Sequence, residues 1–188
     1  FQKISQNMLA GDGNDKYDIA SGSNINALFG DGGTIAFWAT TSHTNTDARL
    51  ADSTGAGNGY KIFLDNASGN KMAVRFAHTF GGGDSTWNTS AFTNNGVPFH
   101  YVITYDGSDG DNLPVIYVNA QSASLTTLPN PSGDIGADSA TKKIGSAGTT
   151  NGWHGVLPSC MMWNSILTSK EVNAIYNSGS QDFNLKQD

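Results

Sequence analysis

Short apolar runs separated by turn-forming residues make up most of the chain. The run at 34–38 follows a glycine-rich turn, and the run at 60–64 is closed by an Asp-Asn pair, as is typical of strands between turns. Residues 71–80 alternate with a period of two, which predicts a strand with one buried face and one partly exposed face. We expect further strands at 100–105, 114–119, 143–145 and 155–163. This pattern predicts an all-β protein built from antiparallel sheets.

A loop rich in Asp and Gly, residues 106–112, separates two of these predicted strands. Apolar runs on either side of such a loop indicate a β-hairpin. We therefore expect 100–105 and 114–119 to lie next to each other in one sheet.

One helix is predicted near the C-terminus. Thr168 and Glu171 have the spacing of a capping box, in which each side chain accepts the other residue's backbone N–H. Gly179 is expected to end the helix, because glycine readily adopts the left-handed conformation that follows many helices. Residues 181–188 are then a polar tail. The apolar positions that share one face of the helix are Val172, Ile175 and Tyr176.

Composition narrows the possible partners. The 188 residues suit a single domain with a real core, and the net charge of -6 argues against nucleic acid, whose phosphates would be repelled. No apolar run approaches the roughly 20 residues of a membrane span, so membrane insertion is not expected. Cys160 is the single cysteine, so it cannot form a disulfide within the chain, and its apolar neighbours predict a small buried core residue.

Five segments follow one another along the chain in a characteristic order: 11–17, 33–38, 99–107, 116–119 and 155–172. This order resembles the laminin-G-like, concanavalin-A-like jelly rolls. The resemblance implies a two-sheet antiparallel β-sandwich, with one short C-terminal helix, that occupies residues 1–180. The hairpin at residues 104–119 is also similar to copies found in bacteriophage structural proteins. Two positions depart from the family pattern: Pro158-Ser159 replaces an acidic pair, and Ala120 replaces a turn glycine.

Catalysis is not expected. The family includes glycoside hydrolases, which need two carboxylates facing the sugar cleft. Glu171 is the only glutamate in the chain, and the capping box already accounts for it. No Ser, Cys or His stands in a nucleophile motif.

Calcium is the one metal considered, because relatives of this fold hold it near loop rims through several oxygen ligands. Two oxygen-rich clusters are candidates, although turn residues that bond their own backbone explain the same pattern. The candidate calcium ligands are Asp12, Asn14 and Asp15 in the first cluster and Asp106, Asp109 and Asp111 in the second.

A sugar site needs an aromatic platform with polar partners. Trp87 is the first candidate, because it follows a Gly-rich segment and is expected to lie in a loop; the alternative is that it anchors that loop. Tyr60, His78 and Trp153 are the residues expected to join it.

These observations favour a non-catalytic recognition or assembly module. The first interpretation is a structural protein of the virion surface, such as a capsid decoration, tail or fibre component, which contacts other virion or surface proteins and forms a homo-oligomer. The alternative is a carbohydrate-binding, lectin-like module of a secreted or cell-surface protein. Both interpretations place the chain on a virion surface or outside the cell.

Overall fold

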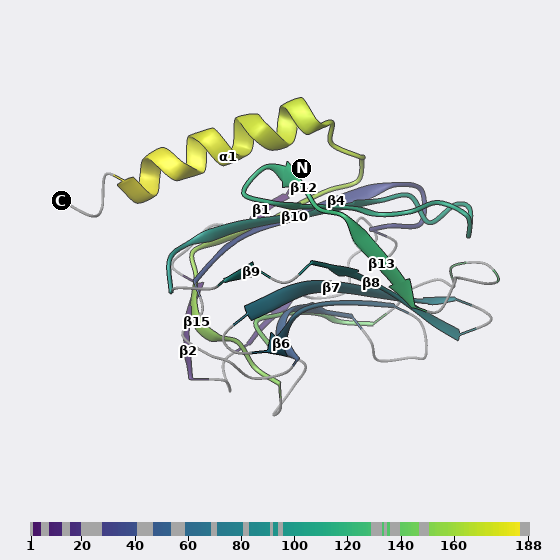
Figure 1. Cartoon of the computed structure of the whole chain (residues 1–188), viewed down its shortest axis with the longest axis horizontal. Helices are drawn as coiled ribbons and strands as arrows, with labels where there is room; N and C mark the ends of the chain where they lie inside the picture. The colour runs from purple at the N-terminus through teal and green to yellow at the C-terminus, as the bar shows by residue number, and fades with distance from the viewer. Residues whose placement is uncertain are drawn as a thin grey trace.

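Two β-sheets packed face to face form the body of the protein, and a helix lies on the outside of one of them (Figure 1). The computed structural model describes residues 2–4, 8–12, 16–19, 28–40, 47–53, 59–68, 71–80, 83–90, 92–93, 96–128, 133, 135, 140–146 and 151–184. Every strand pairing within these residues is antiparallel. The predicted two-sheet sandwich with one C-terminal helix is therefore confirmed.

The first sheet has six strands within the described residues. Its centre is β4, all of whose residues are buried, because the core lies on one side and the C-terminal segment on the other. The predicted hairpin is confirmed, since β10 pairs with β11 along its length. In order, the strands are β1 (Gln2–Ile4), β16 (Ser159–Trp163), β4 (Gly33–Ala39), β10 (Phe99–Tyr105), β11 (Val115–Val118) and β12 (Gln121–Ser122).

The second sheet has eight strands within the described residues. Its path is β13 (Leu125–Leu128), β8 (Gly83–Thr89), β7 (Lys71–Phe80), β6 (Tyr60–Ser68), β5 (Ala48–Asp52), β14 (Lys142–Ile144) and β3 (Tyr17–Ile19), and β9 (Phe92–Thr93) pairs with β7 off this path. The alternation predicted for 71–80 is confirmed at its end, where His78 and Phe80 are buried and Thr79 is half-buried. The other side chains of β7 lie outside the described set.

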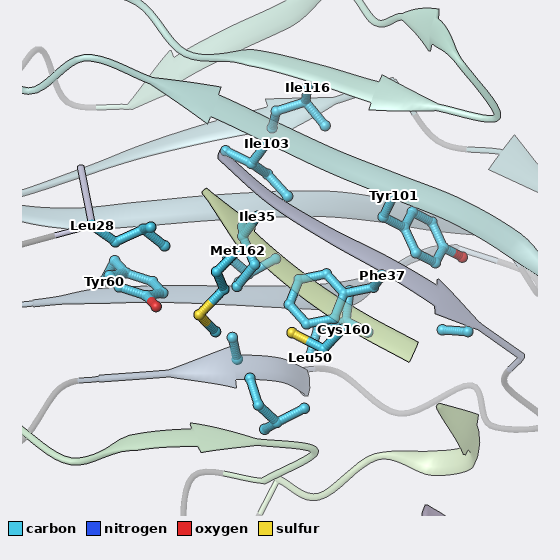
Figure 2. Packing of buried hydrophobic residues seen from close by; sticks show 14 of the residues in the cluster. Leu28, Ile35, Phe37, Leu50, Tyr60, Tyr101, Ile103, Ile116, Cys160 and Met162 are labelled. Atoms are coloured by element: carbon cyan, nitrogen blue, oxygen red, sulfur yellow. The ribbon is translucent and has the colours of Figure 1, made fainter. Parts of the chain in front are cut away.

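A single apolar core fills the space between the two sheets. Figure 2 shows Ile35, Phe37 and Ile103 of the six-stranded sheet facing Leu50 and Tyr60 of the other sheet. Cys160 belongs to this core, as its sequence context predicted. The core thus brings together residues that are distant in sequence. In each strand, every second side chain points into this core.

The predicted strand 155–163 is in fact two strands in two different sheets. β15 (His154–Leu157) pairs with β2 (Met8–Asp12), whereas β16 lies between β1 and β4. Pro158 separates them, and it has no N–H to continue a ladder of hydrogen bonds. The chain therefore leaves one sheet and enters the other at this proline.

The turn between β11 and β12 contains Ala120, at the position where the family pattern has a glycine. Asn119 and Ala120 both have positive φ, 50° and 62°, which is the geometry of a tight hairpin turn. Asn tolerates this conformation and Ala adopts it at a cost of about 1 kcal/mol. The turn keeps its tight form without the usual glycine.

Helix α1 (Ser169–Asn184) covers the outer face of the six-stranded sheet (Figure 1). The capping box is confirmed, because Glu171 Oε2 accepts the Thr168 N–H at 2.8 Å and the Glu171 N–H reaches Thr168 Oγ1 at 3.3 Å. Within the described residues, α1 lacks the length and apolar character that would let a helix cross a membrane. The residues of α1 that pack against the sheet are Val172, Ile175 and Tyr176, as predicted.

The prediction that Gly179 ends the helix is wrong. α1 continues to Asn184, so residues 181–184 are helical rather than a tail, and 185–188 lie outside the described residues. The reason is packing: a Cβ at position 179 would lie 2.2 Å from Trp38 Nε1. Glycine is present because the helix passes close to an indole ring.

Candidate functional site

The outer face of the eight-stranded sheet carries polar and charged residues in register across its strands. Ile62, Leu64 and Trp87 point into the core, so their neighbours Lys61 and Asn88 point outward. We name this surface the polar face and define it by Asp18, Arg49, Asp52, Lys61, Phe63, Thr86, Asn88, Thr126 and Lys143.

One row of the polar face alternates in charge. Asp18 lies opposite Lys143, Lys143 opposite Asp52, and Asp52 opposite Lys61. Opposite charges on directly facing residues stabilise a sheet by roughly 0.2–1 kcal/mol per pair. The row thus spans β3, β14, β5 and β6 and holds charged groups along a line perpendicular to the strands.

The adjacent row mixes a cation, an aromatic ring and polar groups. Arg49 lies opposite Phe63, and Phe63 lies opposite Arg75. The row continues on the next two strands, where Arg75 lies opposite Asn88 and Asn88 lies opposite Thr126. Asn88 is half-buried, and its Oδ1 has no hydrogen-bond partner among the described residues. Thr126 is exposed at the strand that borders the sheet. This row crosses five neighbouring strands and carries polar side chains on β5, β8 and β13.

Arg49 is the most constrained residue of the polar face. Its guanidinium is 2.8 Å from Asp47 Oδ2 and 3.1 Å from Asp52 Oδ2, and it lies 4.9 Å from the centre of the Phe63 ring. The residue is only 7% exposed. Asn151 Nδ2 also donates to Asp47 Oδ2, which ties the segment before β15 to this cluster. Both carboxylates are held by the cation, so the cluster is a rigid support for the polar face.

The prediction that Trp87 lies in a loop is wrong, because it lies in the middle of β8. Its ring is 0% exposed and contacts Tyr105, with 5.3 Å between the ring centroids. The other predicted sugar-binding residues are buried as well: Tyr60 is 2%, His78 3% and Trp153 0% exposed. These side chains belong to the core, and none presents a ring face at the surface for a sugar.

Two of these residues do lie together, but as packing partners. Tyr60 and His78 face each other across β6 and β7, with ring centroids 6.4 Å apart. His78 Nδ1 is 3.0 Å from the Thr79 carbonyl oxygen. Trp153 is separate and donates its indole N–H to the Thr40 carbonyl oxygen at 2.9 Å. The sequence did not indicate that these side chains face the core.

Asp106 and Asp109 of the second calcium cluster make turn hydrogen bonds in the structure, and calcium binding by this cluster stays a prediction. The Asp106 carboxylate accepts the Ser108 N–H at 3.0 Å, and the Asp109 carboxylate accepts the Asp111 N–H at 2.9 Å. These bonds are the turn interactions that Asp commonly makes with its own backbone. Hydrogen bonds from the Ser108 hydroxyl and from the Ser108 backbone N–H lower the pKa of Asp106. Among the described residues, no group of three or more His, Cys, Asp or Glu side chains is placed to hold a metal. Asn14, Asp15 and the Asp12 side chain lie outside the described set.

Glu171 and Cys160 are also placed away from any catalytic arrangement. Hydrogen bonds from the Thr168 backbone and hydroxyl hold the pKa of Glu171 below its usual value, and the residue lies at the start of α1. Burial raises the pKa of Cys160, which keeps the thiol protonated. Neither residue lies on the polar face.

The residues of the polar face were not singled out from the sequence. Lys61, Phe63 and Asp65 alternate with core residues within β6, and this alternation was the available signal. β5, which carries Arg49 and Asp52, was not predicted as a strand, because Ala48–Asp52 has two charged residues in five. Only strand pairing brings these side chains together.

Comparison with known proteins identifies the family. A laminin-G family model, described as the concanavalin A-like lectin/glucanases superfamily, matches residues 11–173. A search of curated proteins finds no match.

Solved structures share the fold at low identity. The binding domain of botulinum neurotoxin DC, solved with rat synaptotagmin II, is 17% identical with a TM-score of 0.64, over 87% of this chain and 40% of that one. The Ruminococcus gnavus IT-sialidase CBM40, bound to alpha2,3 sialyllactose, is 14% identical with a TM-score of 0.61, over 86% of this chain and 96% of that one.

A third structure, the binding domain of Paraclostridial Mosquitocidal Protein 1, is 15% identical with a TM-score of 0.64, over 94% of this chain and 45% of that one. The chain thus spans less than half of the two toxin domains and nearly all of the CBM40. None of these comparisons indicates a bacteriophage or virion component, so that role stays a prediction. The family match extends over most of the chain, and the protein belongs to the concanavalin A-like lectin/glucanases superfamily.

Proposed function

We propose that this protein is a non-catalytic glycan-binding module and that the polar face is its binding surface. The observation that carries the proposal is the contrast between the two outer faces of the sandwich. Helix α1 covers the outer face of the six-stranded sheet with apolar contacts. The polar face instead carries aligned charged, amide and hydroxyl groups, and no helix among the described residues lies on it.

The chemistry of the polar face suits a sugar. Sugar hydroxyls both donate and accept hydrogen bonds, and Lys61, Thr86 and Asn88 supply donors and acceptors on β6 and β8, the two strands that flank β7. The unpartnered Oδ1 of Asn88 is an acceptor that a hydroxyl of a ligand would satisfy. The sialyllactose complex of the CBM40 supports the same class of ligand.

A glycoside hydrolase activity is not proposed, although the superfamily includes glucanases. Hydrolysis requires a pair of free carboxyl groups on either side of the scissile bond. On the polar face, Asp52 is engaged by Arg49, and Glu171 lies at α1 on the opposite side of the molecule. The arrangement fits binding better than bond cleavage. We further propose that the module acts outside the cell or on a particle surface.

The experiment is a glycan array with the whole chain, followed by titration calorimetry on the strongest ligand. Lys61→Ala and Asn88→Ala test the polar face, and Lys170→Ala and Asn177→Ala, at exposed positions of α1, are controls of the same residue types. We expect the polar-face variants to weaken binding at least about 10-fold, which corresponds to about 1.4 kcal/mol. The controls should bind like the unmodified protein.

Two results would contradict the proposal. Equal losses of glycan affinity in the polar-face variants and in the α1 variants would show that the polar face is not the binding surface. Absence of any glycan bound at millimolar concentration, together with a defined oligomer in solution, would favour the structural, virion-surface role instead.

A further inference from the structure

His100 lies at the interface between the six-stranded sheet and α1, enclosed by two aromatic rings. It faces Trp38 across β10 and β4, with 5.0 Å between the ring centroids. Tyr176 of α1 closes over both, at 5.8 Å from His100 and stacked on Trp38 at 5.6 Å. His100 is 0% exposed.

The imidazole of His100 has no polar partner. Neither Nδ1 nor Nε2 makes a hydrogen bond with any residue that the structure describes. A neutral imidazole has one donor and one acceptor, and buried polar groups are nearly always paired. The backbone cannot shift to relieve this, because the His100 N–H donates to Asn119 Oδ1 at 2.9 Å and its carbonyl accepts the Asn119 N–H at 2.8 Å.

No charged group among the described side chains faces the ring. Tyr117 of β11 and Tyr176 of α1 are the ionisable side chains described on this side. The side chains of Lys3 and Asp182 are outside the described set. The backbone positions of both residues are distant from His100: Lys3 is in β1, three strands from β10, and Asp182 follows Tyr176 by almost two helical turns. The other ionisable groups of these elements point elsewhere: Tyr101, Tyr105 and Cys160 face the core, and Lys170 and Glu171 are exposed in the first turn of α1.

We propose that His100 makes the docking of α1 sensitive to acid: protonation of its ring releases the C-terminal part of α1 and uncovers the apolar outer face of the six-stranded sheet. An imidazolium in the closed interface would have two N–H donors without acceptors and no counter-ion. The two aromatic rings would attract the cation, but this attraction is smaller than the penalty of burying a charge without hydrogen bonds. Water must therefore reach the ring.

Helix α1 is the element that can open. The strands beside His100 are held by hydrogen bonds along their whole length, whereas α1 contacts the sheet only through one apolar face. The family match ends at residue 173, so Tyr176 and Gly179, which close over His100 and Trp38, lie beyond it. The helix residues that cover His100 and Trp38 thus lie outside the matched segment, whereas His100 and Trp38 lie within it.

The direction of the pH dependence follows from burial. Burial lowers the pKa of His100 from 6.5 to about 4. Because the closed state holds a proton less tightly than the open state, docking is fully stable above pH 6.5 and weakens as the pH falls toward 4. Between pH 7 and pH 4.5, the closed-to-open ratio of α1 should fall on the order of 50-fold.

The test is hydrogen exchange of the whole chain at pH 7 and pH 4.5, with rates corrected for intrinsic exchange. The amides of residues 176–184 should lose protection on the order of 50-fold at the lower pH, while β4 and β10 keep theirs. His100→Phe keeps an aromatic ring without a titrating group and should abolish this loss. His154→Phe, in β15 and away from α1, is the matched control and should leave it intact.

Three results would overturn the proposal. The first is the same loss of protection in His100→Phe, or in His100→Gln if the Phe variant does not fold. The second is simultaneous loss in β4 and β10, which would mean global unfolding. The third needs no variant: an NMR titration of the unmodified protein that gives His100 a pKa near 6.5 would show that the ring is already open to water.

Discussion

Replacing Thr34 by Val should destabilise the protein, although valine is nearly isosteric with threonine and favours strands. Thr34 lies in β4 and is fully buried. Its hydroxyl donates to the Ser165 carbonyl oxygen at 2.8 Å and accepts the Leu167 N–H at 3.0 Å. One hydroxyl therefore fixes the segment that leads from β16 into α1.

The two bonds differ in what their loss costs. Ser165 is exposed, so its carbonyl can turn to water, and Leu167 is buried, so its N–H would have no partner. An unpaired buried donor costs about 1–3 kcal/mol. The methyl group of valine, buried in place of the hydroxyl, stabilises the folded protein by less than about 1 kcal/mol. We expect Thr34→Val to lower the free energy of unfolding by about 2 kcal/mol.

Urea unfolding followed by tryptophan fluorescence measures this change. With a typical slope of about 2 kcal/mol per molar urea, the midpoint should fall by about 1 M. Thr104→Val is the matched control: Thr104 lies directly opposite Thr34 in β10 and is buried, and its hydroxyl bonds no described residue. If Thr34→Val and Thr104→Val unfold at the same urea concentration, the reasoning about Leu167 is refuted.

Three further predictions concern α1 and calcium. Gly179→Ala should destabilise the protein by about 1 kcal/mol in urea unfolding, because overpacking against Trp38 outweighs the gain in helix propensity; a more stable variant would contradict this. Thr168→Ala should cost about 1 kcal/mol by the same assay and raise the pKa of Glu171 measured by NMR, since a capping hydroxyl is lost. If the calcium candidates around Asp12 bind the ion, chelator should lower the melting temperature and Asp12→Asn should remove that difference; equal melting temperatures would refute the site.

Local patterns in the sequence determined the elements whose signals are complete within a few residues. The alternation over 71–80 and the apolar runs at 34–38 and 100–105 correspond to β7, β4 and β10. The spacing of Thr168 and Glu171 determined where α1 begins, because a capping box involves only one turn of helix. The order of family-like segments determined the fold class.

The tertiary structure decided which side of a sheet each residue faces and where segments end. Trp87 follows glycines that indicate a loop, but pairing with β7 and β13 makes its segment a strand and turns the ring into the core. Gly179 has the composition of a helix end, yet it allows close contact with Trp38. Alternation predicts two faces but does not say which one a second sheet or a helix will cover.

The candidate site depended on tertiary structure to the greatest extent. Arg49, Lys61, Asn88 and Lys143 come from four different strands and meet only because those strands pair in a specific register. The sequence alone determined that a polar-faced sandwich would form. The register of long-range strand pairs, set by burial of the opposite face, determined which polar side chains share a surface.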